Sequence, residues 1–205
     1  MAIVVADIGR AVQRAQACFT VAETELNAAD AKLGDGDTGG MLRRLADGIA
    51  KVDLFHTEDL GIAFTELAKA ASASTGSSLG TLVMTAFMTL AKATRGQTET
   101  ASDRLPELLS GICSAMLARG GAALGDKTVI DGLDAVAEAL RKAEPADYST
   151  AAAQGSQQAL EAFRDRPNRI GRARMYGEKS QGLDDPGMLA LARLCAALAA
   201  DHSKT

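Results

Sequence analysis

The chain has 205 residues, of which 47% are hydrophobic and only 3% aromatic, and its formal net charge is −4. This length suits a single domain, residues 1–205, whose core must be built from Ala, Leu, Val, Ile and Met, an alphabet that favours packed helices over a β-sandwich. The negative charge argues against general nucleic-acid binding, which needs a basic face, but a small phosphate ligand can still be held by metal ions and backbone amides.

The apolar period is helical along nearly the whole chain. The first stripe recurs at three- and four-residue spacing from Ile8 to Leu26. Further helices are predicted at residues 39–53, 57–73, 77–95, 103–119, 127–143, 149–165 and 185–201. About eight helices with mostly short connections predict an all-α antiparallel bundle or barrel. Capping signals mark three of the helix starts, and these are Thr57, Ser102 and the sequence Asp184-Asp185-Pro186.

The cysteines, histidines and apolar runs indicate the cellular compartment of the protein and one class of enzyme that it does not resemble. An odd number of widely spaced cysteines inside helical patterns predicts reduced core thiols, at Cys18, Cys113 and Cys195. The two histidines, His56 and His202, are expected at the surface, which argues against a Ser-His-Asp hydrolase. The first residues are too short for a secretory signal, and no apolar run approaches about 18 residues. A cytoplasmic protein without a membrane segment is therefore expected.

The most informative motif lies between the first two predicted helices. Three carboxylates, Asp30, Asp35 and Asp37, fall within eight residues, and glycines surround the last two. Like charges packed together need a cation or open water, and carboxylate ligands suit Mg²⁺ or Ca²⁺ better than zinc. An EF-hand is excluded because its fifth position, counted from Asp35, is Gly39. The spacing alone leaves two interpretations, a metal site and a solvated turn.

A second loop, Ala73–Gly80, contains small hydroxyl residues before a predicted helix. Free amides at a helix start can bind phosphate, but Ser and Thr also serve there as ordinary N-caps. A third segment, Gly120–Thr128, resembles a P-loop only superficially. Asp126 interrupts the required glycine–lysine step and no strand precedes it, so a P-loop is rejected.

The longest predicted loop, Gly171–Gly187, is rich in glycine and carries Arg172, Arg174 and Lys179. Arginine matches the geometry of phosphate oxygens, so this loop could close over a polyphosphate. A solvated loop followed by a capped helix explains the same residues equally well.

Taken together, these motifs resemble the L subunit of bacterial dihydroxyacetone kinase, equivalent to the C-terminal nucleotide domain of single-chain dihydroxyacetone kinases. They occur in the order of that family and span almost the whole chain. The matching elements are Asp30 with Gly34–Gly39, Thr75-Gly76 with Gly80-Thr81, Gly125–Thr128, Gly171–Ala173, Tyr176–Glu178 and Asp185–Gly187. The chain departs from the family at Thr38, where some members carry His, at Gly40, where some carry Asn, and in the more polar loop at Thr75–Ser78.

The resemblance implies an eight-helix antiparallel up-and-down barrel with the nucleotide bound in the loops at one end. Asp30, Asp35 and Asp37 would hold two Mg²⁺ ions and, with Arg172, would carry the catalysis. The residues implied to contact ADP or ATP are Thr38, Gly39, Gly40, Met41, Ser74, Thr75, Gly76, Gly120, Arg172, Asp185 and Pro186. Two divalent ions would offset polyphosphate charge and stabilise the transferring phosphoryl group.

The resemblance also implies a partner. In this family the ketone substrate is held on a separate K subunit or domain through a histidine, so the chain is expected to transfer phosphoryl groups only beside a K-type partner. Two phosphoryl sources remain open: free ATP, and a bound ADP recharged by a phosphotransferase-system protein. A rival hypothesis from another class is a non-catalytic, ADP-loaded binding module that docks on a regulator.

Overall fold

The computed structural model describes residues 2–200, and in this part of the chain it contains eight α-helices. Their bounds are α1 (Val5–Asp30), α2 (Thr38–Ala50), α3 (Leu60–Ser74), α4 (Ser78–Ala93), α5 (Leu105–Gly120), α6 (Val129–Arg141), α7 (Tyr148–Phe163) and α8 (Pro186–Ala199). Three 3-10 segments accompany them, η1 (Ser102–Arg104), η2 (Pro145–Asp147) and η3 (Arg172–Ser180). The all-α class expected from the apolar period is confirmed.

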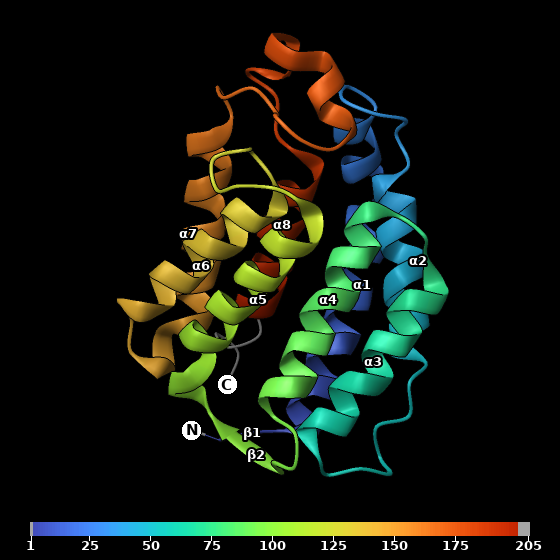
Figure 1. Ribbon diagram of the computed structural model, residues 1–205, viewed down its shortest axis with the longest axis vertical. Coiled ribbons are helices and arrows are strands. Elements are labelled where there is room, and N and C mark those ends of the chain that lie inside the picture. The colour runs from blue at the N-terminus through green and yellow to red at the C-terminus, as the bar shows by residue number, and fades with distance from the viewer. Residues whose placement is uncertain (1, 201–205) are drawn as a thin grey trace.

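The helices run alternately up and down and close into a ring (Figure 1). Each helix packs against the next along the chain, and α8 packs back against α1. Because directions alternate, the connections after α1, α3, α5 and α7 all lie toward the upper end in Figure 1, with the connection after α3 lower than those after α1 and α7. Apolar side chains from α1, α2, α3, α7 and α8 form the largest core cluster, and a second cluster joins α4, α5 and α6. The expected antiparallel barrel is therefore confirmed.

The predicted helix limits differ from the observed ones by a few residues. The start near residue 57 is wrong: α3 begins at Leu60, with Asp59 as its N-cap accepting from the amide of Ile62, while Thr57 only bonds the amide of Asp59. Ser102 likewise opens a 3-10 turn before α5 rather than capping that helix. The start signal at Asp184-Asp185-Pro186 is confirmed, and the N-cap is Asp185, whose carboxylate accepts from the amide of Met188.

A small sheet at the lower end was not anticipated. The strands β1 (Ala2–Val4) and β2 (Glu99–Ala101) pair antiparallel, with Ile3 opposite Thr100.

No helix in residues 2–200 is both long and apolar enough to span a bilayer. His56 is exposed as expected, with 86% of its side chain accessible, whereas His202 lies outside the described residues. Cys113 and Cys195 are buried, Cys18 is half-buried, and all three are free.

Candidate functional site

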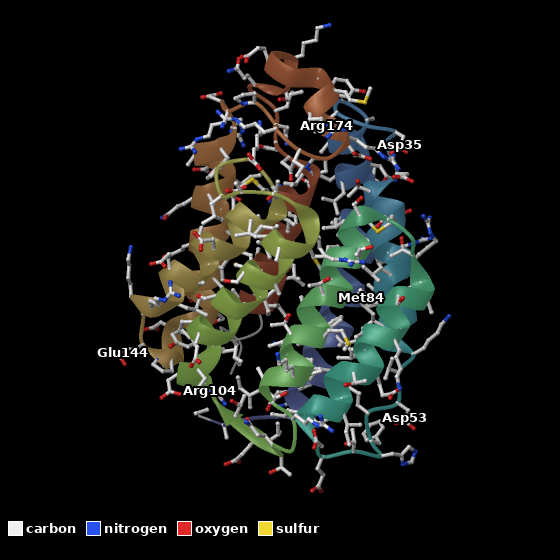
Figure 2. All side chains as sticks on the ribbon, in the orientation of Figure 1. Asp35, Asp53, Met84, Arg104, Glu144 and Arg174 are labelled. Carbon is white, nitrogen blue, oxygen red and sulfur yellow. The ribbon has the colours of Figure 1, made fainter. Side chains whose placement is uncertain are left out.

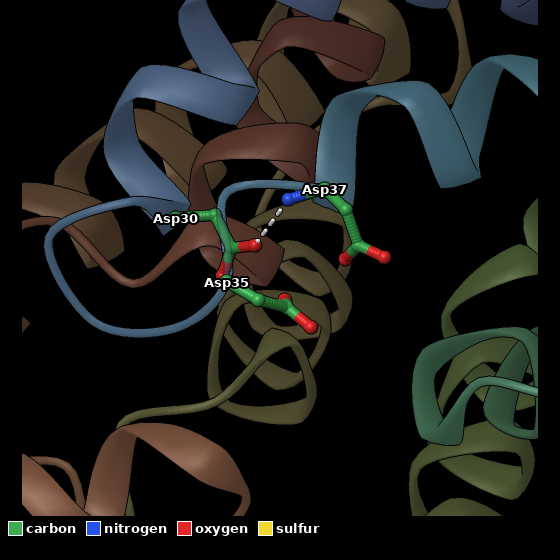
Figure 3. A group of neighbouring side chains, drawn as sticks. All are labelled: Asp30, Asp35 and Asp37. Carbon is green, nitrogen blue, oxygen red and sulfur yellow. Dashed lines mark hydrogen bonds between the residues drawn. The ribbon is translucent and has the colours of Figure 1, made fainter.

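Three aspartates converge where α1 ends and α2 begins (Figure 3). One carboxylate oxygen from each of Asp30, Asp35 and Asp37 lies within 4.8 Å of the other two. Asp30 is 9% exposed, whereas Asp35 and Asp37 are open to solvent. The Oδ2 atom of Asp30 accepts from the backbone amides of Asp37 at 2.9 Å and Thr38 at 3.2 Å. The buried carboxylate therefore orders the loop that presents the two exposed ones.

The first turn of α2 is pressed against α1 by a close backbone approach. A Cβ atom on Gly39 would lie 2.1 Å from the carbonyl oxygen of Glu23, so only glycine fits there. The side chain of Asn27 accepts from the amide of Gly40 at 3.1 Å. Among the described contacts, the amide of Gly39 has no hydrogen-bond partner. The positive end of the α2 dipole and this amide thus lie beside the aspartates, where an anion would be favoured.

The donor set of the cluster fits a hard divalent cation. All three ligands are carboxylate oxygens, which Mg²⁺ and Ca²⁺ prefer. Oxygens on opposite sides of one Mg²⁺ lie about 4.2 Å apart, so small side-chain rotations would bring these three to a shared ion. Two of the carboxylates remain exposed and can share ions with a phosphate ligand. The solvated-turn interpretation accounts less well for Asp30, which is buried while it faces two other acids.

Arg172 reaches the same cluster from the far end of the chain. It opens η3, and its guanidinium donates to the carboxylate of Asp35. The pair is exposed, so its own contribution to stability is small. Figure 2 places Asp35 and Arg174 at the same end of the molecule, opposite Asp53 and Glu144. The structure therefore brings the predicted catalytic arginine into contact with the predicted aspartate cluster.

The serine-rich loop adopts the capping structure that was one of its two interpretations. Ser77 Oγ accepts from the amide of Gly80 at 2.9 Å, and Thr75 Oγ1 accepts from the amide of Ser77 at 3.1 Å. Ser74 lies against Gly48 in the lower half of α2, where a Cβ atom would be 1.9 Å from Ser74 Oγ. This loop therefore lies lower along the barrel than the aspartates, and no described contact joins Ser74, Thr75 or Gly76 to them (Figure 1).

The remaining residues implied to contact the nucleotide lie at the same end of the barrel as the aspartates. Gly120 is the exposed last residue of α5, and Gly121 ends that helix with a left-handed φ of 63°. Pro186 is buried in the first turn of α8. Burial raises the pKa of Asp185 to about 6, and the hydrogen bonds from the Met188 amide and the Asn168 side chain only partly oppose this. Asp185 is thus an acid that titrates near neutral pH.

Two features of this end were not found from the sequence. Asn27, which ties α2 to α1, lies one turn before Asp30 on α1, and this spacing was the available signal. Lys127 falls in the rejected P-loop and in the family element Gly125–Thr128, but the sequence assigns it no role of its own, whereas in the structure it is 1% exposed and its side chain donates to three backbone carbonyl groups. No local pattern identifies such a lysine, because its partners lie 37 to 53 residues away.

The structure is of the class of antiparallel helical barrels with an aspartate cluster at one end. Comparison with known proteins gives its family. The model of the DAK2 domain matches residues 32–200. The chain therefore belongs to the DAK2 domain family, as the sequence motifs indicated. It is 28% identical over 175 residues to the ADP-binding subunit DhaL of the PEP-dependent dihydroxyacetone kinase of Escherichia coli, covering 82% of this chain and 83% of that subunit.

Larger kinases contain a similar domain. The chain is 35% identical to L-erythrulose 1-kinase of Mycolicibacterium smegmatis over 184 residues, which are 86% of this chain and 32% of that protein. The crystal structure of the dihydroxyacetone kinase from C. freundii in complex with AMP-PNP and Mg²⁺ matches with a TM-score of 0.74 and 30% identity, over 96% of this chain and 34% of that one. The chain thus spans about a third of the length of these kinases.

Proposed function

We propose that this chain is the nucleotide-binding part of a ketose kinase. It would hold a magnesium nucleotide at Asp30, Asp35 and Asp37 and pass a phosphoryl group to a short ketose held on a separate K-type partner. The observation that carries this proposal is the convergence of three carboxylate oxygens within 4.8 Å beside a helix N-terminus. The names of the relatives support the substrate class, since they act on dihydroxyacetone or erythrulose.

Each residue of the cluster would have a distinct task. Asp30 is already oriented by two amides, so it would offer its other oxygen to an ion at little cost in side-chain entropy. Asp35 and Asp37 are exposed and would hold the outer faces of one or two ions. The bound Mg²⁺ would offset the phosphate charge and stabilise charge on the transferring group. The Gly39 amide would donate to a phosphate oxygen.

Arg172 would change partner when the site fills. A divalent cation and the guanidinium compete for the same carboxylate of Asp35. A polyphosphate bound at the cluster offers Arg172 new oxygen acceptors, with a geometry that suits its planar fork. Arg172 would therefore leave Asp35 to the ion and contact the phosphates, where it can stabilise transition-state charge.

Two phosphoryl sources fit this site. In one, ADP stays bound and is recharged by a phosphotransferase-system protein, and the DhaL relatives with PEP-dependent names favour it. In the other, ATP exchanges freely. A resident ADP would survive gel filtration, so chromatography of the nucleotide released by denaturing the purified protein decides between them. Empty protein that exchanges ATP rapidly would favour the second source.

The proposal is tested by binding and by transfer. ADP should bind tightly with Mg²⁺ and weakly in EDTA when titrated calorimetrically, and equal affinity in both would refute the metal site. Phosphorylation of dihydroxyacetone or erythrulose should require both this chain and a K-type subunit. Tight Mg-ADP binding without transfer beside any K-type partner would instead favour the non-catalytic binding module.

A further inference from the structure

Lys127 is the largest side chain below 2% exposure among the described residues. Its Nζ atom donates to the carbonyl oxygens of Arg164 at 2.9 Å, Arg166 at 2.8 Å and Ser180 at 2.9 Å. An ammonium group has three N–H donors, so all three are used. No described ion pair includes this lysine. A buried cation is costly unless it is fully hydrogen-bonded, and here backbone carbonyl groups meet that need.

The three carbonyl groups come from both ends of one segment. Arg164 and Arg166 directly follow α7, and Ser180 ends η3. Between them lies the stretch that carries Arg172, whose guanidinium contacts Asp35. Lys127 therefore closes residues 164–180 into a loop and fixes both of its ends to the start of α6.

The backbone of Lys127 is tied to the same loop and to α8. Asn168 Nδ2 donates to the Lys127 carbonyl oxygen at 2.9 Å and to Asp185 Oδ2 at 2.9 Å. The amide of Asn168 in turn donates to Ser180 Oγ at 2.8 Å. Lys127 adopts a φ of 63°, the one positive φ of a residue other than glycine in residues 2–200. Such a conformation is unfavourable for a side chain and persists only where the surroundings hold it in place.

The charges around the ammonium group act in opposite directions. Burial lowers the pKa of Lys127, and the nearby Asp185 and Asp184 carboxylates oppose this. Asp184 is bound to Arg164 by two hydrogen bonds, and Asp185 caps α8. The ammonium group thus lies between the Arg172 segment and the start of α8, without being neutralised by direct contact with either acid.

We propose that Lys127 is a positioning residue for nucleotide binding: its buried ammonium group holds the 164–180 segment so that Arg172 stands over the aspartate cluster. The proposal rests on the proposed nucleotide site and adds a residue to it. Lys127 itself would touch no phosphate, because its three donors are already used and its side chain is buried. Its effect on the ligand would pass entirely through the segment that carries Arg172.

A double-mutant cycle tests this route. Wild type, Lys127→Met, Arg172→Ala and the double variant are titrated calorimetrically with ADP in excess Mg²⁺, well below their melting temperatures. Arg172→Ala should weaken binding by about ten- to a hundredfold, as expected for loss of a charge-assisted hydrogen bond. Lys127→Met should weaken it similarly, and the double variant should be within about twofold of the weaker single variant. If the affinity losses of the two single variants multiply in the double variant, the positioning role is overturned.

Hydrogen exchange of the ligand-free protein gives a second readout that does not depend on nucleotide. Amides of residues 172–179 should exchange at least about tenfold faster in Lys127→Met, while those in the middle of α1 keep their wild-type rates. Lys127→Gln, which retains two donors but no charge, gives the same comparison if the methionine variant does not fold. Unchanged exchange at 172–179 in the variant that folds would overturn the proposal.

A core truncation elsewhere controls for lost stability. Leu140→Ala removes a side chain that is 4% exposed in α6, outside the lysine cluster. It should lower the melting temperature but leave Mg-ADP affinity within about twofold of wild type and exchange at 172–179 unchanged. If wild type itself does not bind Mg-ADP, the nucleotide proposal fails, and the exchange comparison still decides whether Lys127 positions the segment.

Discussion

The guanidinium of Arg172 donates to the carboxylate of Asp35, although 137 positions separate the two residues in the chain. This contact joins the loop after α1 to the segment before α8, and the packing of α8 on α1 brings them to the same end of the barrel. An acidic cluster and a basic segment that face each other in this way can exchange partners when a cation and an anion arrive together.

Neutralising one exposed carboxylate should weaken the magnesium complex without harming the fold. Asp37→Asn removes a charge from the cluster, so Mg-ADP should bind at least about tenfold more weakly. In EDTA the variant should melt at or above the wild-type temperature, because like-charge repulsion is reduced. Calorimetric titration and thermal melts measure both effects. Glu144→Gln, an exposed change at the opposite end, should alter neither (Figure 2), and equal affinity of Asp37→Asn and wild type would contradict a metal role for Asp37.

Substituting Gly39 should separate α2 from α1. A Cβ atom there would meet the Glu23 carbonyl oxygen at 2.1 Å, and backbone cannot move aside as a flexible side chain does. Gly39→Ala should lower the free energy of unfolding by about 1–3 kcal/mol, as overpacking does, and should also weaken Mg-ADP binding. Chemical denaturation measures the loss. Gly9→Ala in α1, with nothing within 4 Å of the added atom, should be neutral or stabilising by up to about 1 kcal/mol; similar losses in both variants would argue against the steric cause.

How far the sequence predicts this molecule depends on the range of the interactions. Helices were found because their signals are local: a period of three to four residues, and caps such as Asp185. The pairing of Ile3 with Thr100 was missed because strands of three residues leave no periodic signal. The spacing of Asp30, Asp35 and Asp37 indicated either a cation site or a solvated turn, because the three residues are close in the sequence, but the spacing alone could not choose between the two. The carbonyl cage of Lys127 was not predictable, because its acceptors are backbone atoms that any residue could supply.

Asp185 should make stability fall as pH rises from about 4 to about 6. Its folded pKa of about 6 lies above the ordinary value of 3.8 because its carboxyl group is buried. The folded protein therefore keeps a proton that the unfolded chain has released, and the stabilisation present below about pH 4 is lost as pH rises through the folded pKa. The loss should be on the order of 2 kcal/mol.

Asp185→Asn isolates this contribution. Asparagine is uncharged at every pH and is also a good N-cap, so the α8 start should survive. In ligand-free protein, the free energy of unfolding of the variant minus that of wild type should increase from pH 4 to pH 7. Urea denaturation across this range measures the difference. A difference that stays flat from pH 4 to pH 7 would show that the carboxyl group of Asp185 is not protonated in the folded protein near pH 5.

Mg-ADP should protect the Arg172 segment from trypsin. Arg172 and Arg174 are exposed on η3, and Lys127 holds the two ends of the segment rather than the stretch around these arginines, so trypsin can reach both of them. Within residues 2–200, the exposed pair with Asp35 is the one described contact of the Arg172 side chain, and such pairs are weak. A bound polyphosphate should replace that contact with stronger ones and slow cleavage after both arginines several-fold. Arg172→Ala should lose the protection at Arg174 and most of the phosphoryl transfer, but little stability, since no apolar side chain is removed. Cleavage at the same rate with and without Mg-ADP would mean that the segment only connects α7 to α8 and that its arginines do not contact the nucleotide.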